Sequence, residues 1–282
     1  MTRLTVLITG ATRGLGYEAV RLLSERAHDT IVLLGCRSLD AGHRSIEKMK
    51  VENKDFSYDN VQAQVIDVTN STSIASAVDN IKSNYGHLDV LINNAGIIGR
   101  PEEGGVDTCF KTNVFGVYNS MVSFLPIMVP NKAKFIVVAS EVGAWSCNAM
   151  TDELKTIFLN YENMTQERLK ELVEDSTKSY QKQPTKYTWP TFEATYGPYG
   201  VSKTMILSIT RKFAAEHSPD YHTVMVCPGY CATGLNHFSG FRTAIQGAES
   251  ILYPLFNRTE NGGFYQDGIV HSFDTPRPAH LH

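Results

Sequence analysis

Short apolar runs alternate with segments of helical periodicity through the first ninety residues, and this alternation limits the folds open to the chain. The apolar runs are almost unbroken and lie at residues 4–9, 31–34, 61–68 and 88–92. Segments with apolar residues at helical spacing lie between them, at about 14–26, 39–51 and 70–81. Strands that are apolar on both faces are typical of a parallel sheet covered by helices on both sides. The pattern therefore predicts a doubly wound α/β fold.

The second half continues the alternation with one interruption. We expect strands at 135–139 and 222–227, and the start of a short seventh strand at 262–265. We expect helices at about 106–128, where Pro126 kinks or ends the helix, and at 200–216.

Residues 148–195 show no convincing strand pattern and predict a helical insertion. One helix is expected to be capped by Thr151, and a second to span about 165–180. The segment is too short and too poor in apolar residues for an independent core. The length of 282 residues alone allows one domain or two.

Composition excludes several classes of function. Lys and Arg number 26 and Asp and Glu number 29, so the formal net charge is −3. This near-balance gives no reason to expect a nucleic acid or an anionic membrane as a partner. No stretch approaches the roughly 18 apolar residues of a membrane helix. Met1 leads almost directly into a strand-like run, so no targeting peptide is expected.

The cysteines and histidines point to a reduced protein without a metal site. The five cysteines are odd in number and contain no C-x-x-C pair, and the nine histidines have no metal-ligand spacing. We therefore expect a cytoplasmic location. Cys227 and Cys231 flank a Pro-Gly turn, where packing is the favoured interpretation and an oxidisable thiol is the alternative.

A glycine-rich run follows the first strand and precedes the first helix. Glycines at this place let the backbone turn tightly and approach a pyrophosphate, which then lies at the positive end of the helix. A purely structural turn is the alternative interpretation. The residues expected to hold a dinucleotide here are Gly10, Thr12, Arg13, Gly14, Leu15 and Gly16.

The end of the second strand predicts which dinucleotide binds. An acidic residue there would bind the adenosine ribose hydroxyl and select NAD, but the strand ends Gly35-Cys36-Arg37. Arg37, with Arg13 in the glycine-rich run, is suited to a 2′-phosphate. The sequence therefore favours NADP(H), the alternative being that both arginines are only solvated surface residues.

Two further strand ends could contact the cofactor. Asp67 follows the third strand and could accept a hydrogen bond from an adenine amino group, or could instead cap a helix. The run Asn93-Asn94-Ala95-Gly96 follows the fourth strand, where small and amide residues let the backbone pass close to adenine and ribose, although any turn could look the same. The cofactor residues expected here are Asp67, Val68, Asn93, Ala95 and Gly96.

The catalytic hypothesis rests on four residues taken together. Tyr199 and Lys203 are four apart, so they lie on one face of a helix. An ammonium beside a phenol lowers the phenol pKa from about 10 towards that of a useful general acid. Ser140 ends a strand and could hold a carbonyl oxygen, and Asn113 lies in a helix. Any one of these residues alone would be weak support.

In order along the chain, these motifs resemble those of the short-chain dehydrogenase/reductase family. They are T-G-x-x-x-G-x-G, N-N-A-G, a helical Asn, S-x-x-G from Ser140 to Gly143, Y-x-x-x-K, and P-G. The resemblance covers essentially the whole chain. It implies a Rossmann-like fold and hydride transfer between a nicotinamide and a carbonyl or alcohol carbon.

The resemblance also implies residue roles. Tyr199 would be the general acid/base, and Lys203 would lower its pKa and bind the nicotinamide ribose. Ser140 would polarise the carbonyl, and Asn113 would hold a water in a proton relay. Further cofactor contacts would come from Pro228, Gly229 and Thr233.

Closer similarity points to the carbonyl-reductase branch. Residues 111–116 and the long insertion before Tyr199 are similar to that branch, which implies NADPH use and a monomer. Two departures stand beside the catalytic serine: Ala139 replaces a second serine of many relatives, and Glu141 places a carboxylate near the site, where it could affect substrate choice.

An apolar substrate pocket is expected from segments that should surround the reacting carbon, with ordinary packing as the alternative for each residue. The candidate walls are Trp145, Met150, Trp189, Tyr196 and Tyr230.

Together these features predict a single domain over residues 1–282 that reduces a ketone, aldehyde or quinone with NADPH. One alternative is an alcohol dehydrogenase that works oxidatively with the same residues. The other is a non-catalytic NADP(H)-sensing regulatory protein, which would not need Asn113, Ser140, Tyr199 and Lys203.

Overall fold

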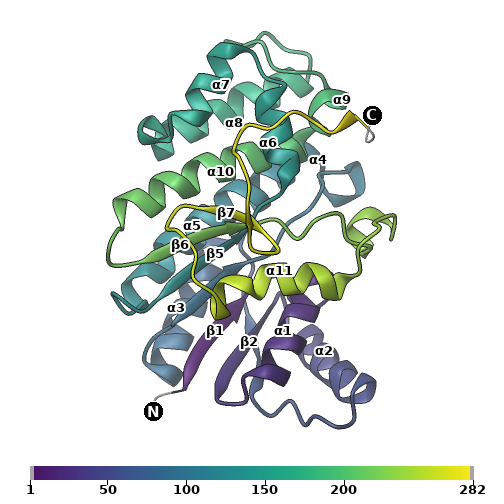
Figure 1. Cartoon of the computed structure of the whole chain (residues 1–282), viewed down its shortest axis with the longest axis vertical. Coiled ribbons are helices and arrows are strands. Elements are labelled where there is room, and N and C mark those ends of the chain that lie inside the picture. Colours follow the sequence, from purple (N-terminus) through teal and green to yellow (C-terminus); the bar gives the residue numbers. More distant parts are fainter. Residues whose placement is uncertain (1–2, 280–282) are drawn as a thin grey trace.

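The computed structural model describes residues 3–279, which form one eight-stranded sheet with helices on both faces (Figure 1). The strand order is β3-β2-β1-β4-β5-β6-β7-β8. All neighbouring pairs are parallel except β7 and β8, which are antiparallel. The strands are β1 (Leu4–Ile8), β2 (Thr30–Cys36), β3 (Val61–Val65), β4 (Val90–Asn93), β5 (Lys134–Val138), β6 (His222–Val226), β7 (Phe264–Gln266) and β8 (Ile269–Val270). The predicted doubly wound parallel sheet is confirmed.

Alternate residues of each central strand enter different halves of the core. In β1, Val6 and Ile8 belong to one buried cluster while Leu7 belongs to the other. The first cluster is covered by α1 (Gly14–Arg26), α2 (Leu39–Glu52) and α11 (Ala244–Phe256). The second is covered by α3 (Ser71–Tyr85), α5 (Val117–Phe124) and α10 (Pro198–Glu216). Both faces of the sheet are thus removed from water, as the nearly continuous apolar runs require.

Side-chain caps fix the starts of several helices. The Asn70 side chain accepts a hydrogen bond from the Ser73 amide before α3. Thr151 and Thr165 do the same for α7 (Asp152–Leu159) and α8 (Gln166–Tyr180). Each cap satisfies a backbone donor that the helix itself leaves unpaired.

The helix expected at 106–128 is not one regular helix. It consists of α4 (Gly105–Phe110), a π-helical turn η2 (Lys111–Gly116), α5, and a 3-10 turn η3 (Leu125–Ile127). Pro126 lies in that last turn and the helix ends there, as expected. The π-turn carries Asn113, and such turns are frequent at functional sites.

The insertion packs on the main core instead of forming a core of its own. It contains α7, a 3-10 turn η4 (Tyr161–Asn163), α8 and α9 (Phe192–Thr195), with no strand among its residues. It follows α6 (Glu141–Asn148), which the sequence did not predict. Figure 1 shows α7, α8 and α9 at one end of the molecule, beside α10. Leu154, Phe158, Leu169 and Leu172 join the same buried cluster as the α10 side of the sheet.

The carboxyl-terminal region contains the expected short seventh strand, β7, and two elements that periodicity did not reveal, α11 and β8. α11 carries Pro254 inside the helix, which weakens any helical prediction for that segment, and β8 pairs with β7 as the edge strand of the sheet. Beyond β8 the chain runs up towards α6 and α9 (Figure 1), where Asn148 donates to Asp274 at 2.7 Å. Within the part of the chain described, no helix has the length and apolarity to span a bilayer.

Candidate active site

The turn between β1 and α1 is shaped for close approach of a ligand to the backbone. Gly10 has φ +63°, and a Cβ atom there would lie 2.9 Å from Cα of Ala95. Gly14 has φ +58°, a conformation that side chains disfavour. This turn and the loop after β4 therefore form one surface at the carboxyl ends of β1 and β4, which we call the glycine cradle (residues 9–16 and 93–96).

Asn94 holds the glycine cradle together, a role that sequence reasoning did not assign. Its Nδ2 donates to the carbonyl oxygens of Thr9 at 2.8 Å and Gly10 at 3.2 Å. The backbone amides of Asn94 and Ala95 donate to Oγ1 of Thr9 at 3.0 and 3.1 Å. A Cβ on Gly16 would lie 2.4 Å from Asn94 Nδ2, so this glycine makes room for the amide.

The remaining cradle residues have distinct surroundings. Leu15 packs beside Gly247 of α11, and the Thr12 carbonyl oxygen accepts from Ser45 Oγ at 3.2 Å. Asn93 is 2 % exposed, and neither atom of its amide has a hydrogen-bond partner in the described structure. A bound ligand could supply the hydrogen bonds that this buried side-chain amide lacks.

Two exposed arginines lie in the glycine-rich turn and at the end of the neighbouring strand β2. Arg37 follows β2 directly, Arg13 precedes α1, and both are exposed. No carboxylate forms an ion pair with either guanidinium in the part of the chain described. Together with the glycine cradle, they fit a phosphorylated dinucleotide.

Asp67 is engaged locally. Its Oδ1 accepts from the Thr69 amide at 2.9 Å and from Thr69 Oγ1 at 2.7 Å, while Asn70 caps α3. Asn70, and not Asp67, therefore caps α3. Val68 is buried, with its Cγ2 only 2.9 Å from the place a Cβ on Gly116 would occupy.

Tyr199 and Ser140 meet at the carboxyl end of β5. Ser140 follows β5, and its Oγ accepts from the Val142 amide at 3.2 Å. Burial raises the pKa of Tyr199, and the nearby Ser140 side chain lowers it only in part. The predicted net lowering is therefore wrong for this structure, because desolvation of the phenolate outweighs the favourable contacts.

Lys203 lies one turn further along α10 and is 6 % exposed. Its Nζ is 5.6 Å from the centre of the Tyr199 ring and donates to the Val138 carbonyl oxygen at 2.7 Å. Burial lowers the pKa of Lys203 to about 8. The ammonium is thus held at the end of β5, beside the phenol.

Asn113 is fixed by the loop after β4 and by α10. Its Oδ1 accepts from the Ile97 amide at 2.9 Å, and its Nδ2 donates to the Ile97 carbonyl oxygen at 2.8 Å. Nδ2 also lies 3.0 Å from Oγ of Ser202, which in turn donates to the Tyr199 carbonyl oxygen at 2.6 Å. The structure therefore brings all four predicted catalytic residues together and adds Ser202, which only its position between Tyr199 and Lys203 could have signalled.

The predicted pocket walls divide into two groups. The rings of Trp145 and Tyr196 lie 6.3 Å apart, and the guanidinium of Arg277 lies 4.5 Å from the Tyr196 ring centre. Trp189 is instead part of the insertion: its Nε1 donates to Asp175 at 2.8 Å and its ring faces Phe158. Met150 is likewise buried in the main core.

The segment 228–242 lies against the glycine cradle. Gly229 has φ +75°, and the Thr233 side chain lies 3.6 Å from the place a Cβ on Gly14 would occupy. The guanidinium of Arg100, in the loop after β4, donates to the Leu235 carbonyl oxygen. This bond ties the segment to the opposite side of the site.

The same segment carries exposed aromatic side chains. Tyr230 is 45 % exposed, and its ring centre lies 5.9 Å from that of Phe241. Phe238 and Phe241 are also largely exposed, and pattern reasoning did not single them out because they belong to an irregular loop.

The cysteines behave as packing residues. All five are free and buried, and burial raises the pKa of Cys227 to about 12. Its Sγ accepts from the amides of Glu141 and Gly229, both at 3.4 Å. Among the described residues, no group of three or more His, Cys, Asp or Glu side chains is arranged to hold a metal ion.

Comparison with known proteins extends this picture. A chain described as (+)-neomenthol dehydrogenase of Capsicum annuum is 29 % identical, covering 87 % of this chain and 89 % of that one. Carbonyl reductase [NADPH] 1 of Rattus norvegicus is 27 % identical, covering 95 % and 97 %. The structure of salutaridine reductase from Papaver somniferum is similar with a TM-score of 0.78 at 26 % identity, covering 93 % and 99 %.

The family model described as short chain dehydrogenase matches residues 4–152, from β1 to the start of the insertion. That span is more than half of the chain and includes the glycine cradle, Asn113 and Ser140. The chain therefore belongs to the short-chain dehydrogenase family, and its relatives include carbonyl reductases.

Proposed function

We propose that this oxidoreductase reduces the carbonyl group of a small molecule, a ketone, aldehyde or quinone, to an alcohol with NADPH. The observation that carries the proposal is the convergence of Ser140, Tyr199, Lys203 and Asn113 beside the glycine cradle. A protein that only senses the dinucleotide would not need a phenol, a hydroxyl and an ammonium at one point.

The residues supply the acid half of the reaction. The hydroxyl groups of Ser140 and Tyr199 would donate hydrogen bonds to the carbonyl oxygen of the substrate and so polarise the carbonyl. NADPH, when bound, supplies the hydride. Tyr199 then gives its proton to the oxygen, and the ammonium of Lys203 stabilises the phenolate that remains.

Burial raises the pKa of Tyr199, so the phenol carries its proton in this structure, as the proton donor of a reduction must. An alcohol oxidation would run through the same residues in reverse, with the phenolate as the proton acceptor. The relatives carry both dehydrogenase and reductase names, so oxidation by the same residues is the alternative that the assay must separate.

The preference for NADPH rests on the two arginines. Arg13 lies in the cradle and Arg37 directly follows β2, and neither has a carboxylate partner among residues 3–279. Cys36 stands where an acidic residue would select NAD. A relative whose name specifies NADPH supports the same choice. The five free cysteines support a cytoplasmic location as part of the proposal.

The role of Tyr199 is tested by Tyr199→Phe. We expect turnover to fall by at least about 10²-fold because the proton donor is lost. NADPH affinity should stay within a few-fold, because the ring remains. Turnover is measured as NADPH oxidation over a panel of aromatic, terpenoid, steroid and quinone carbonyls. NADPH affinity is measured by fluorescence titration. Retained turnover would reject Tyr199 as the acid, and tight NADPH binding with no turnover of any carbonyl by the unchanged protein would favour a sensor.

Cofactor choice is tested separately by Arg37→Asp. The carboxylate repels a 2′-phosphate and can accept from a ribose hydroxyl, so we expect NADPH to bind more weakly and NADH to bind as well or better. The ratio of kcat/KM for the two cofactors is the measurement. A wild-type protein that already prefers NADH would contradict the argument from the arginines.

A further inference from the structure

A cavity of about 400 Å³ lies at the amino-terminal ends of β5 and β6. The catalytic groups lie at the opposite, carboxyl ends of the strands, so this cavity is separate from the proposed active site. Its walls come from three segments that are distant in sequence: 131–134, 219–222 and 257–259. The volume falls in the range of about 300–1,000 Å³ usual for small-molecule sites.

Most of the charged side chains that line the cavity are basic. Lys132, Lys134 and Arg258 carry positive charge, His222 is titratable, and Asp220 is the one carboxylate among the lining residues. In the part of the chain described, neither Asp220 nor any other carboxylate forms an ion pair with the three cations. The lining therefore holds an excess of positive charge without counter-charges in contact.

Strand register places two of these groups side by side. Lys134 and His222 are direct neighbours in the parallel pairing of β5 and β6, and both are partly buried. Lys134 Nζ donates to the Pro254 carbonyl oxygen at 2.7 Å, and His222 Nε2 lies 2.8 Å from Thr259 Oγ1. The contact to Pro254 uses one ammonium hydrogen and leaves two for other acceptors.

The surroundings disfavour the positive charges in the absence of an anion. Burial lowers the pKa of Lys134, and burial together with Lys134 lowers the pKa of His222. The contact of Lys134 with the last turn of α11 is explained by the negative end of that helix. The same explanation does not account for Lys132 and Arg258, for which no side-chain hydrogen bond with the end of α11 is found among the described residues.

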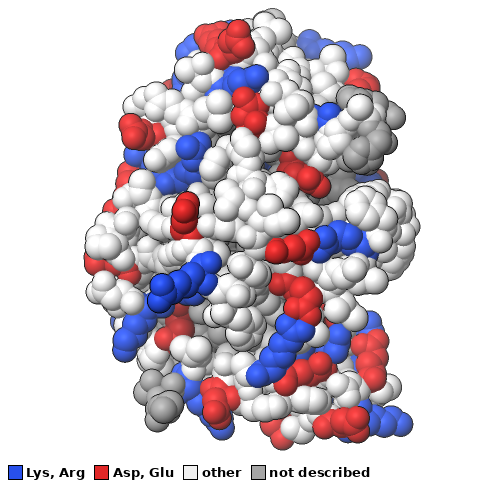
Figure 2. Space-filling model, in the orientation of Figure 1, with Lys and Arg blue, Asp and Glu red and all other residues white. Residues whose placement is uncertain are grey.

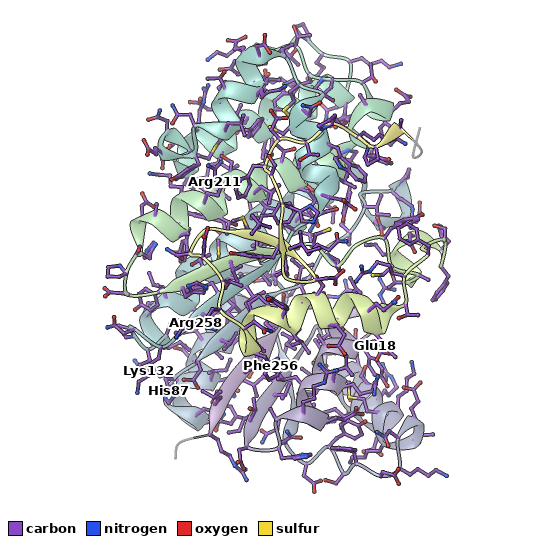
Figure 3. The ribbon with its side chains drawn as sticks, in the orientation of Figure 1. Glu18, His87, Lys132, Arg211, Phe256 and Arg258 are labelled. Atoms are coloured by element: carbon purple, nitrogen blue, oxygen red, sulfur yellow. The ribbon has the colours of Figure 1, made fainter. Side chains whose placement is uncertain are left out.

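The two exposed cations lie on one flank of the molecule. Figure 3 labels Lys132 and Arg258 near each other on that side, and Figure 2 shows basic side chains exposed on the same flank. Long side chains at this position can move towards a bound group, while Lys134 and His222 stay fixed by the sheet.

We propose that this cavity is a second ligand site, which binds the phosphate group of a small phosphorylated molecule. Lys132 and Arg258 would contact the phosphate from the exposed side, and Lys134 and His222 from the partly buried side. Lysine and arginine are the usual ligands of phosphate oxygens, and charge-assisted hydrogen bonds supply most of the affinity. The proposal does not depend on the reaction assigned to the active site.

Inorganic phosphate is the probe, and the ring proton signal of His222 is the reporter. The glycine cradle also attracts phosphates, so a reporter inside the cavity is needed; His222→Asn assigns the signal in the ¹H NMR spectrum. At constant ionic strength, set with sodium chloride, phosphate should shift the signal saturably. It should also raise the pKa of His222, because an anion favours the charged imidazole.

Charge-removing variants decide the outcome. Lys132→Gln with Arg258→Gln should weaken phosphate binding about tenfold or more, since two charge-assisted contacts are lost. Lys54→Gln with Lys170→Gln removes the same charge at exposed positions outside the cavity and should leave binding unchanged. Both altered cavity residues are exposed, and Arg258→Gln alone is a milder second variant.

Two results would overturn the proposal. One is a His222 signal that phosphate does not move. The other is equal weakening in the cavity variant and in the control variant, which would show only general attraction to a positive surface.

Discussion

Single hydroxyl groups decide how the catalytic residues are held. Ser202 is fully buried, and its Oγ connects the Tyr199 carbonyl oxygen with the Asn113 amide, so it joins α10 to the π-turn. Ser208, six residues further along the same helix, is also buried, yet its hydroxyl has no partner in the described structure. The two serines look alike in the sequence and differ only in what surrounds them.

Ser202→Ala should therefore act on catalysis. Removing Oγ leaves the Asn113 amide with one acceptor fewer, so we expect kcat to fall about tenfold while KM for NADPH changes little. Ser208→Ala is the matched control and should leave kcat unchanged. A positioning role also predicts that Ser202→Ala has little further effect in an Asn113→Ala background. Equal losses from the two serine variants would contradict this role.

At the scale of elements, one buried carboxylate organises the end of the insertion. Asp175 of α8 accepts from the backbone amides of Lys186 and Tyr187, at 2.7 and 3.1 Å, and from Trp189 Nε1. These bonds explain why the loop after α8 folds back, and why Trp189 serves the insertion. They also lower the pKa of Asp175.

Asp175→Ala should destabilise the insertion. Three donors lose their acceptor, so we expect the free energy of unfolding to fall by roughly 2–4 kcal/mol and proteolysis to increase within 181–190. Glu174→Ala, at an exposed neighbouring position, is the control. Because the folded-state pKa is depressed, the stabilising effect is complete above the ordinary carboxyl pKa and is lost as pH falls through the lower folded value. Urea unfolding at neutral and acidic pH should show the two proteins converging in acid.

The sequence predicts whether a segment is a helix or a strand where its periodicity is strong. It does not predict whether a helical segment is α-helical or π-helical. A π-turn has the same apolar pattern as an α-helix, so nothing in residues 111–116 distinguishes the two until packing is formed. α11 was missed because Pro254 conflicts with a helix interior. Lys134 donates to the Pro254 carbonyl oxygen, which lies in the last turn of that helix.

At the scale of the whole molecule, the insertion determines which surfaces remain free. Arg211 and Lys212 of α10 donate to the carbonyl oxygens of Leu159 and Glu162, at 3.2 and 3.0 Å, so the insertion is bound to the side of that helix. The Arg211 guanidinium also lies between the rings of Tyr161 and Phe273, at 4.1 and 4.2 Å. This side of α10 is therefore not available to a second copy of the chain.

We accordingly predict a monomer in solution. Size-exclusion chromatography with light scattering should give a mass of about 31.3 kDa across a range of protein concentrations. A mass twice as large would show that another surface forms a dimer. Neither result changes the assignment of the catalytic residues, which all come from one chain.

The sequence by itself predicted the doubly wound sheet, the glycine-rich turn after β1, and Asn113, Ser140, Tyr199 and Lys203 as candidate catalytic residues. The sheet follows from local periodicity, and the candidate residues follow from motif spacing and the family resemblance, which are properties of the linear chain. Only the tertiary structure decided the net direction of the Tyr199 pKa, the positions of Trp189 and Ser202, and the basic cavity at the amino-terminal ends of β5 and β6. Desolvation, hydrogen bonding and clustering of charge depend on residues that are far apart in sequence, and they exist only once the sheet has brought those residues together.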